Sequence, residues 1–149
     1  MTMANTFLLE EIQIKLVDQD TEASTLSLIE TMFSLKSTNH SFLNSMDQNQ
    51  RSFIAVLKNL VVGHVLITTL MDPVKKVSFY RLDYICVATD YQKRGIGTKL
   101  LEFVEELAGQ EKITWIEFTS AYYRKEAHSF YLINDYQIRD TATFRKVIK

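Results

Sequence analysis

Apolar and polar residues alternate or recur in patterns that predict a strand followed by two helices in the first part of the chain. Residues 12–16 alternate between apolar and polar side chains, as a strand with one buried face requires. Residues 21–35 carry apolar side chains at helical spacing, and Asp18 and Asp20 stand before them as sources of capping oxygens. Residues 41–49 are expected to form a second, shorter helix.

The middle of the chain is rich in the residues that strands prefer. Residues 51–57 and 60–70 are predicted to pair as a hairpin, because the asparagine in the intervening residues 58–59 tolerates the positive φ of a tight turn. Residues 71–76 contain the only proline and are expected to form a second turn. Residues 77–87 are a third strand, whose apolar end is typical of a strand covered on both faces.

The last part of the chain is predicted to alternate between helices and strands. Residues 95–109 show one clear apolar helix face, and residues 113–119 form a short apolar strand. A short helix is expected over residues 125–133, and strands over residues 136–138 and 143–148 are expected to end the chain. This order of elements indicates the α/β class with a mixed sheet.

Length and composition fit one globular domain. The chain has 149 residues, of which 46% are hydrophobic and 23% are charged, so a sizeable core can form. No stretch rich in Pro, Gly or Ser indicates a linker, and no segment is repeated. Residues 1–149 are therefore expected to form a single domain.

Charge and residue usage argue against several functions. A net charge of -1 disfavours a nucleic-acid or acidic-membrane binder, which needs an excess of positive charge. The single cysteine excludes an intrachain disulfide, and His40, His64 and His128 lack ligand spacing, so no metal site is expected. No apolar run is long enough to cross a membrane and no signal peptide is evident, so a cytoplasmic protein is expected.

The segment of residues 87–98 carries the most informative chemistry. It lies between a buried strand and the longest amphipathic helix, with Gly95 and Gly97 at the helix start. Glycine lets a ligand approach the backbone closely, and the first amides of a helix attract anions such as phosphate. Two glycines alone also fit an ordinary turn, and neither a Walker A loop nor a dinucleotide fingerprint is complete. Three basic residues add positive charge to this stretch: Lys93, Arg94 and Lys99.

Two motifs, in this order, resemble those of the GCN5-related N-acetyltransferases, the GNAT family. Residues 92–97, Gln-Lys-Arg-Gly-Ile-Gly, are similar to the family's Gln/Arg-x-x-Gly-x-Gly/Ala loop, and residues 82–87 to its fourth strand. Residues 124–131 resemble the family's Ala-x-x-Phe-Tyr helix. After this helix, Asp135 stands at a position where many members have glycine. The resemblance implies an acyl-CoA N-acyltransferase fold (α/β, or α+β), with a mixed central sheet of six to seven strands flanked by about four helices.

The resemblance also implies acetyl-CoA as the cosubstrate. Its pyrophosphate would lie on backbone amides of the loop residues, namely Gln92, Lys93, Arg94, Gly95, Ile96, Gly97 and Thr98. The pantetheine arm would pair like an extra strand with Ile85, Cys86 and Val87, where a backbone N–H stabilises the thioester oxyanion. Arg124 would either reach a cofactor phosphate or cap a strand end.

Acetyl transfer to an amine needs a base that takes the ammonium proton and benefits from an acid that protonates the leaving thiolate. Asp83 matches an acidic position of some relatives and is the first candidate base, with Glu117 second; a solvated or ion-paired Asp83 fits the sequence equally well. Tyr131 matches the family's proton-donating tyrosine, and a phenol of pKa about 10 is protonated at neutral pH. Packing is the alternative role for Tyr131 and the expected role for Phe130. Cys86 is expected to be buried and inert.

The expected activity is transfer of an acetyl group from acetyl-CoA to a primary amine of a small molecule or peptide, directly within a ternary complex. The alternative is a non-catalytic acyl-CoA-binding module or regulatory subunit with the same fold. His64 is expected to serve the structure rather than an acceptor pocket. Members of the family are often dimers, so a homodimer is compatible with the resemblance. The acceptor is expected near the first two helices and the strand ends, around Phe33, His40, Phe42, Tyr80, Tyr122 and Tyr123.

Overall fold

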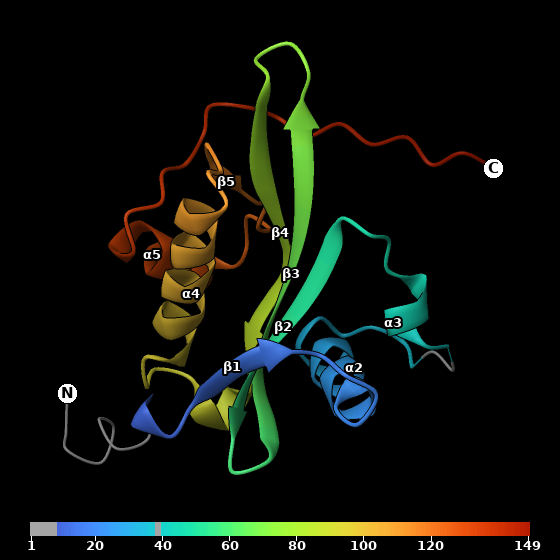
Figure 1. The fold of residues 1–149 in the computed structure, drawn as a ribbon, viewed down its shortest axis with the longest axis vertical. Helices are drawn as coiled ribbons and strands as arrows, with labels where there is room; N and C mark the ends of the chain where they lie inside the picture. Colours follow the sequence, from blue (N-terminus) through green and yellow to red (C-terminus); the bar gives the residue numbers. More distant parts are fainter. Residues whose placement is uncertain (1–8, 38–39) are drawn as a thin grey trace. The chain divides into compact units, whose positions relative to one another are not determined.

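The computed structural model describes residues 9–37 and 40–149, and the chain divides into two compact units, Met1–Phe118 and Thr119–Lys149. The first unit contains a five-stranded sheet of order β1-β2-β3-β4-β5, antiparallel from β1 to β4 and parallel between β4 and β5. The sheet is therefore mixed, and the predicted α/β class is confirmed (Figure 1). The elements of this unit are β1 (Gln13–Leu16), α2 (Glu22–Met32), α3 (Phe42–Ser45), β2 (Gln50–Leu57), β3 (Leu60–Asp72), β4 (Val77–Val87), the 3-10 turn η1 (Thr89–Tyr91), α4 (Ile96–Gln110) and β5 (Ile116–Glu117).

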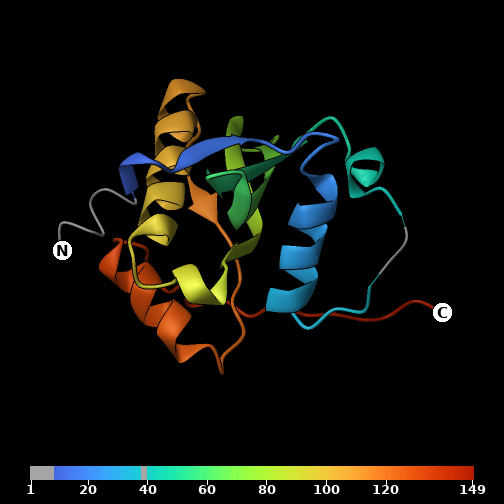
Figure 2. The same cartoon turned by 90° about the horizontal axis from the view of Figure 1, so that it is seen from below.

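Helices α2 and α4 pack against β3 and β4 from opposite faces of this sheet. Figure 2 shows the sheet between α4, in orange and yellow, and α2, in blue. Alternation along β3 assigns its residues to the two faces. A Cβ atom added at Gly63 would lie 2.9 Å from Cδ1 of Leu100, so Gly63, Val65 and Ile67 face α4. The residues between them, His64 and Leu66, face α2.

The predicted hairpin between β2 and β3 forms with the expected turn chemistry. Lys58 and Asn59 have φ values of 47° and 67°, the left-handed pair that a type I′ turn requires. This turn pairs Leu57 with Leu60 and brings the two strands into an antiparallel ladder. On the α4 face the rings of Phe53 and Phe103 meet edge to face, with centroids 4.8 Å apart.

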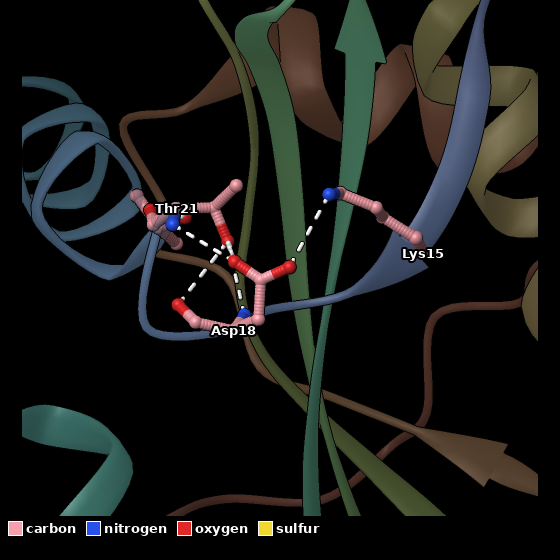
Figure 3. A network of polar contacts seen from close by, with 4 residues as sticks. Lys15, Asp18 and Thr21 are labelled. Atoms are coloured by element: carbon pink, nitrogen blue, oxygen red, sulfur yellow. Dashed lines mark hydrogen bonds and ion pairs between the residues drawn. The ribbon is translucent and has the colours of Figure 1, made fainter.

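Asp18, which was expected to cap α2, instead closes the turn before this helix (Figure 3). The Asp18 carboxylate accepts the Thr21 N–H at 2.9 Å, and the Thr21 hydroxyl accepts the Asp18 N–H at 3.0 Å. The helix itself begins after Thr21, whose side chain makes no capping hydrogen bond. Lys15 adds an ion pair to Asp18 at 3.3 Å.

The second unit contains α5 (Lys125–Ile133), which coincides with the helix expected from the sequence. The two strands predicted after it are wrong, because residues 136–138 and 143–148 belong to no strand in the described chain. Residues 137–149 are all exposed. A segment rich in strand-forming residues becomes a strand only where a neighbouring strand supplies hydrogen bonds.

The strand predicted over residues 113–119 is also shorter than expected, because β5 contains only Ile116 and Glu117. The described residues therefore hold five strands rather than six to seven, with four α-helices, α2 to α5. The turn after α5 agrees with the sequence. Asp135 has a φ of 66°, the left-handed conformation that its place in a glycine position predicts.

Candidate active site

A β-bulge interrupts β4 beside the predicted cofactor loop. Leu66 pairs with Asp83 and His64 with Cys86, so two residues of β4 oppose one residue of β3. The first of the two, Tyr84, has a φ of 50°, which is uncommon for a residue other than glycine. Such a bulge bends the strand and leaves one residue outside the regular ladder. The sequence carries no signal for it, because neither glycine nor asparagine occupies the position.

Strand β5 pairs with only the first half of β4. The two parallel strands share two register pairs, Tyr80 with Ile116 and Arg81 with Glu117. The end of β4, where Ile85, Cys86 and Val87 lie, extends past this ladder.

The apolar end of β4 was expected to be covered on both faces, and this expectation is wrong. Tyr84 is 43% exposed, whereas Cys86 is 5% exposed. The reason is the bulge, which turns Tyr84 out of the regular alternation. Tyr84 instead meets Phe33, the residue after α2, edge to face with centroids 5.2 Å apart.

The loop after β4 leads into the start of α4 through two residues with left-handed backbone. Lys93 and Gly95 have positive φ values of 60° and 88°, and Gly95 is the residue that caps α4. The Lys99 N–H makes the first helical bond, to the Gly95 carbonyl at 3.0 Å. The preceding amides, from Ile96 to Thr98, have no acceptor within the helix and lie at the positive end of its dipole. This helix start can bind the diphosphate of a nucleotide-like cosubstrate.

A side-chain hydrogen bond ties this loop to the end of β4. The Gln92 side-chain amide donates to the Val87 carbonyl at 2.9 Å. A Cβ atom added at Gly95 would lie 3.1 Å from Cδ1 of Leu9, so the backbone turn there is also close to the N-terminal segment. The side chain of Ile96 is 1% exposed, so Ile96 offers a ligand only its backbone.

The three basic residues of the loop have different surroundings. Lys93 is exposed, and the Arg94 guanidinium lies 5.7 Å from the centroid of the Tyr91 ring, within cation–π range. The Lys99 ammonium donates to the carbonyls of Leu9 and Ile12 at 2.7 and 3.0 Å, so its positive charge is held beside the N-terminal segment.

The two candidate bases differ in their surroundings. Asp83 shares the α2 face with Leu66, its partner in the ladder. Burial raises the pKa of Asp83 above its ordinary value, and the nearby Arg81 opposes the shift. Glu117 instead forms an ion pair with Arg81 at 3.1 Å. A raised pKa makes Asp83 a better proton acceptor than an ordinary aspartate, and among the described residues its carboxylate is not held in an ion pair as that of Glu117 is.

His64 is a buried residue whose surroundings the sequence did not predict. Its side chain is 1% exposed, and its ring nitrogens lie 2.6 Å from Oγ of Ser52 and 2.8 Å from the carbonyl of Tyr84. The expected structural role of His64 is therefore confirmed. The hairpin register explains the contact with Ser52. Ser52 pairs with Leu66, which lies two residues after His64 and on the same face of β3.

Arg124 and Tyr131 belong to the second unit, at the start and within the third turn of α5. Arg124 is the residue before the helix, and its carbonyl accepts the His128 N–H at 3.1 Å. The Tyr131 ring lies 5.4 Å from that of Phe130 and 6.4 Å from that of Tyr136, centroid to centroid. The two predicted site residues of this unit thus share one short helix, while the predicted loop, strand and base residues share the first unit.

Tyr80 does not belong to an acceptor site as expected. It is fully buried on the α4 face, where its hydroxyl donates to Glu111 and accepts from Arg51 at 3.1 Å. Burial raises the pKa of Tyr80 to about 12, so the phenol stays protonated. Phe33 remains near the end of β4, beside Tyr84.

Comparison with known proteins shows the family to which the chain belongs. The model of the Acetyltransferase (GNAT) family matches residues 18–133, which is more than half of the chain. The chain belongs to the GNAT family of acetyltransferases. It is a GNAT-type N-acetyltransferase, and the family implies the use of acetyl-CoA. No curated protein sequence matches the chain.

Solved structures share this fold at low sequence identity. An aminoglycoside acetyltransferase from an uncultured soil metagenomic sample, in complex with sisomicin, is 19% identical, with a TM-score of 0.88 over 95% of this chain and 99% of that one. A ribosomal-protein-alanine N-acetyltransferase from Brucella melitensis biovar Abortus is 16% identical, with a TM-score of 0.78 over 92% and 99% of the chains. A GNAT family acetyltransferase from Staphylococcus aureus is 14% identical, with a TM-score of 0.75 over 93% and 99%. At these identities the likeness shows the fold alone.

Two further observations concern metal ligands and membrane-spanning helices. Among residues 9–37 and 40–149, no cluster of three or more His, Cys, Asp or Glu side chains is arranged to hold a metal ion. Within the same residues, no helix has the length and apolar character needed to span a bilayer.

Proposed function

We propose that this acetyltransferase moves the acetyl group of acetyl-CoA onto a primary amine of a small molecule or peptide, directly within a ternary complex. The proposal rests on the start of α4, which Gly95 caps. The backbone amides of this helix start follow the end of β4 that β5 does not pair. Backbone donors at Gln92, Lys93, Arg94, Gly95, Ile96, Gly97 and Thr98 would hold the diphosphate. The part of β4 that lies past its pairing with β5, at Ile85, Cys86 and Val87, would pair with the pantetheine arm.

Bound acetyl-CoA supplies an activated thioester, whose carbonyl carbon forms a C–N bond to the amine as its C–S bond breaks. Asp83 would take the proton that the attacking nitrogen loses, directly or through water, and its raised pKa supports this role. Tyr131 would give its phenolic proton to the departing sulfur. Arg124, at the start of the same helix as Tyr131, would contact a cofactor phosphate.

The residues around Asp83 indicate the chemical class of the acceptor amine. A base of raised pKa beside the exposed Tyr84 ring and Phe33 suits an amine that arrives protonated, because aromatic faces attract cations. Two structural relatives, an aminoglycoside acetyltransferase in complex with sisomicin and a ribosomal-protein-alanine N-acetyltransferase, have names that point to acceptors of this kind. Small polyamines, aminoglycosides and peptide N-termini are therefore the first acceptors to test.

The test is a thiol-release assay with acetyl-CoA and a panel of these amines. The proposal predicts coenzyme A release above hydrolysis with at least one amine, together with an acetylated product of the expected mass. Tight acetyl-CoA binding without amine-dependent release would instead favour the non-catalytic acyl-CoA-binding module. Absence of acetyl-CoA binding would contradict the proposed cofactor site itself.

A further inference from the structure

The ring nitrogens of His64 have defined roles. A carbonyl oxygen only accepts hydrogen bonds, so the contact of 2.8 Å to the Tyr84 carbonyl requires that Nδ1 of His64 carries the proton. In the neutral ring Nε2 is then an acceptor, and the Ser52 hydroxyl donates to it at 2.6 Å. Burial lowers the pKa of His64 to about 4, so the neutral ring persists at neutral pH.

The carbonyl that His64 holds belongs to the bulge of β4. Tyr84 has a φ of 50°, and residues held in such conformations persist only where their surroundings fix them. A buried donor on β3 that reaches the Tyr84 carbonyl is such a constraint, because a bulge takes one residue out of the ladder. Ser52 on β2 bonds to the other nitrogen of the ring, so β2, β3 and β4 are linked through one histidine, whose contact with the Tyr84 carbonyl does not depend on Ser52.

The peptide group that contains the Tyr84 carbonyl also contains the N–H of Ile85. In a planar trans peptide the C=O and N–H bonds point in opposite directions. His64 lies on β3 and draws the Tyr84 carbonyl toward that strand, so the Ile85 N–H is directed away from β3. The opposite side of β4 is the edge on which pairing with β5 ends at Arg81.

We propose that His64 is a positioning residue for acetyl transfer, which fixes the bulge so that the Ile85 amide faces the thioester carbonyl at the open edge of β4. The inference rests on the proposed function, since it assigns an oxyanion donor to the same site. His64 acts through the backbone and does not touch the substrate. Amide donors fixed in this way stabilise the charge that develops on the thioester oxygen.

Three variants separate this role from a purely structural one. His64→Asn places an amide nitrogen near the position of Nδ1 and keeps the donor to Tyr84, whereas His64→Gln places one near Nε2 and loses that donor. Ser52→Ala removes the other partner of the ring and leaves the bond to Tyr84. All three should lower the melting temperature, because each leaves a buried polar group with one partner fewer.

Only His64→Gln should lower kcat strongly, by at least about tenfold, since small misplacements of catalytic groups cost this much or more. His64→Asn and Ser52→Ala should keep kcat within about threefold, and Kd for coenzyme A should change little in all three, because the diphosphate site at α4 is unaltered. Equal kcat losses in Ser52→Ala and His64→Gln, or no loss in His64→Gln, would overturn the inference.

A second readout covers the case in which His64→Gln does not fold. His64→Asn and Ser52→Ala must then still keep kcat, and a large loss in either folded variant would overturn the inference. Failure of the proposed function has a different signature, because the unaltered protein would then show neither acetyl-CoA binding nor amine-dependent release of coenzyme A.

Discussion

The side-chain amide of Gln92 donates a hydrogen bond of 2.9 Å to the carbonyl of Val87. This bond joins the loop before α4 to the last residue of β4, so the anion site and the open strand edge are held at one fixed spacing. A cosubstrate that uses both must match that spacing. The relationship therefore gives Gln92 a role through its side chain as well as through its backbone.

Replacing Gln92 tests this connection. Gln92→Ala should raise KM for acetyl-CoA about fivefold, because one hydrogen bond contributes about 1 kcal/mol. Gln92→Glu should raise it further, since a carboxylate repels both the Val87 carbonyl and the incoming diphosphate. The matched control is Gln110→Ala at the other end of α4, which should leave KM unchanged; equal KM values for all four proteins would contradict the role.

The helix start is tested by adding bulk and charge at its glycines. Gly95→Asp and Gly97→Asp should abolish acetyl-CoA binding in calorimetry, because each places a negative charge at an anion site. At Gly95 the φ of 88° adds strain of roughly 1–2 kcal/mol for any L side chain. Gly95→Ala separates the two effects, with a lower melting temperature but only partly reduced affinity. Unchanged affinity in both aspartate variants would count against the loop.

The pH dependence of turnover tests Asp83 as the base. Burial raises the pKa of Asp83, so its carboxylate is lost on acidification at a higher pH than that of an ordinary aspartate, near 3.9. The acidic limb of kcat/KM should therefore lie above that value, and Asp83→Asn should lower kcat/KM about a hundredfold and remove the limb. Glu117→Gln should retain the limb; if it loses the limb and Asp83→Asn does not, the base is Glu117.

The proton donor is tested at Tyr131. Tyr131→Phe keeps the ring that packs beside Phe130 and removes only the hydroxyl. Turnover should fall about a hundredfold, the lower range for a lost general acid, while Kd for acetyl-CoA stays nearly the same. Equal rates for Tyr131→Phe and the unaltered protein at several pH values would remove the acid role.

A stability prediction concerns the cluster of Arg51, Tyr80 and Glu111. Hydrogen bonds from Arg51, 2.7 and 2.9 Å long, lower the pKa of the Glu111 carboxyl. A carboxyl whose pKa is lower in the folded state stabilises the fold above its unfolded pKa, and this stabilisation is lost as pH falls through the folded value.

Glu111→Gln should therefore lower the melting temperature at pH 7, and the difference from the unaltered protein should shrink as pH falls below about 4.3. The exposed Glu106 on α4, the helix that ends just before Glu111, offers a matched control, because Glu106→Gln should change the melting temperature little at either pH. A difference for Glu111→Gln that stays constant from pH 7 to pH 3 would contradict the lowered pKa.

Much of the first unit could be predicted from the sequence because local rules and tertiary packing agree there. The left-handed turn at Lys58 and Asn59 and the apolar face of α4 both follow from residue type and spacing. The bulge at Tyr84 could not be predicted, since its conformation depends on His64, twenty residues earlier in the chain.

The remaining differences have the same origin in long-range contacts. The β-branched and aromatic residues of 143–148 predict a strand, but a strand also needs a paired neighbour, and these residues are exposed. The hydrogen bonds of the Lys99 ammonium to the carbonyls of Leu9 and Ile12 join segments about ninety residues apart, and no local pattern indicates them. The loop and the helix start of the candidate site were thus predictable, whereas the bulge of β4 and the partners of the polar side chains were not.

The central claim is that the first amides of α4 bind the diphosphate of acetyl-CoA, and amide NMR tests it most directly. The chain has four glycines, and Gly97 and Gly109 lie near opposite ends of α4, about 18 Å apart along the helix axis. Titration with coenzyme A should shift the Gly95, Gly97 and Thr98 amide resonances strongly and that of Gly109 little. Saturable binding that shifts Gly109 and leaves Gly95 and Gly97 unchanged would contradict the account.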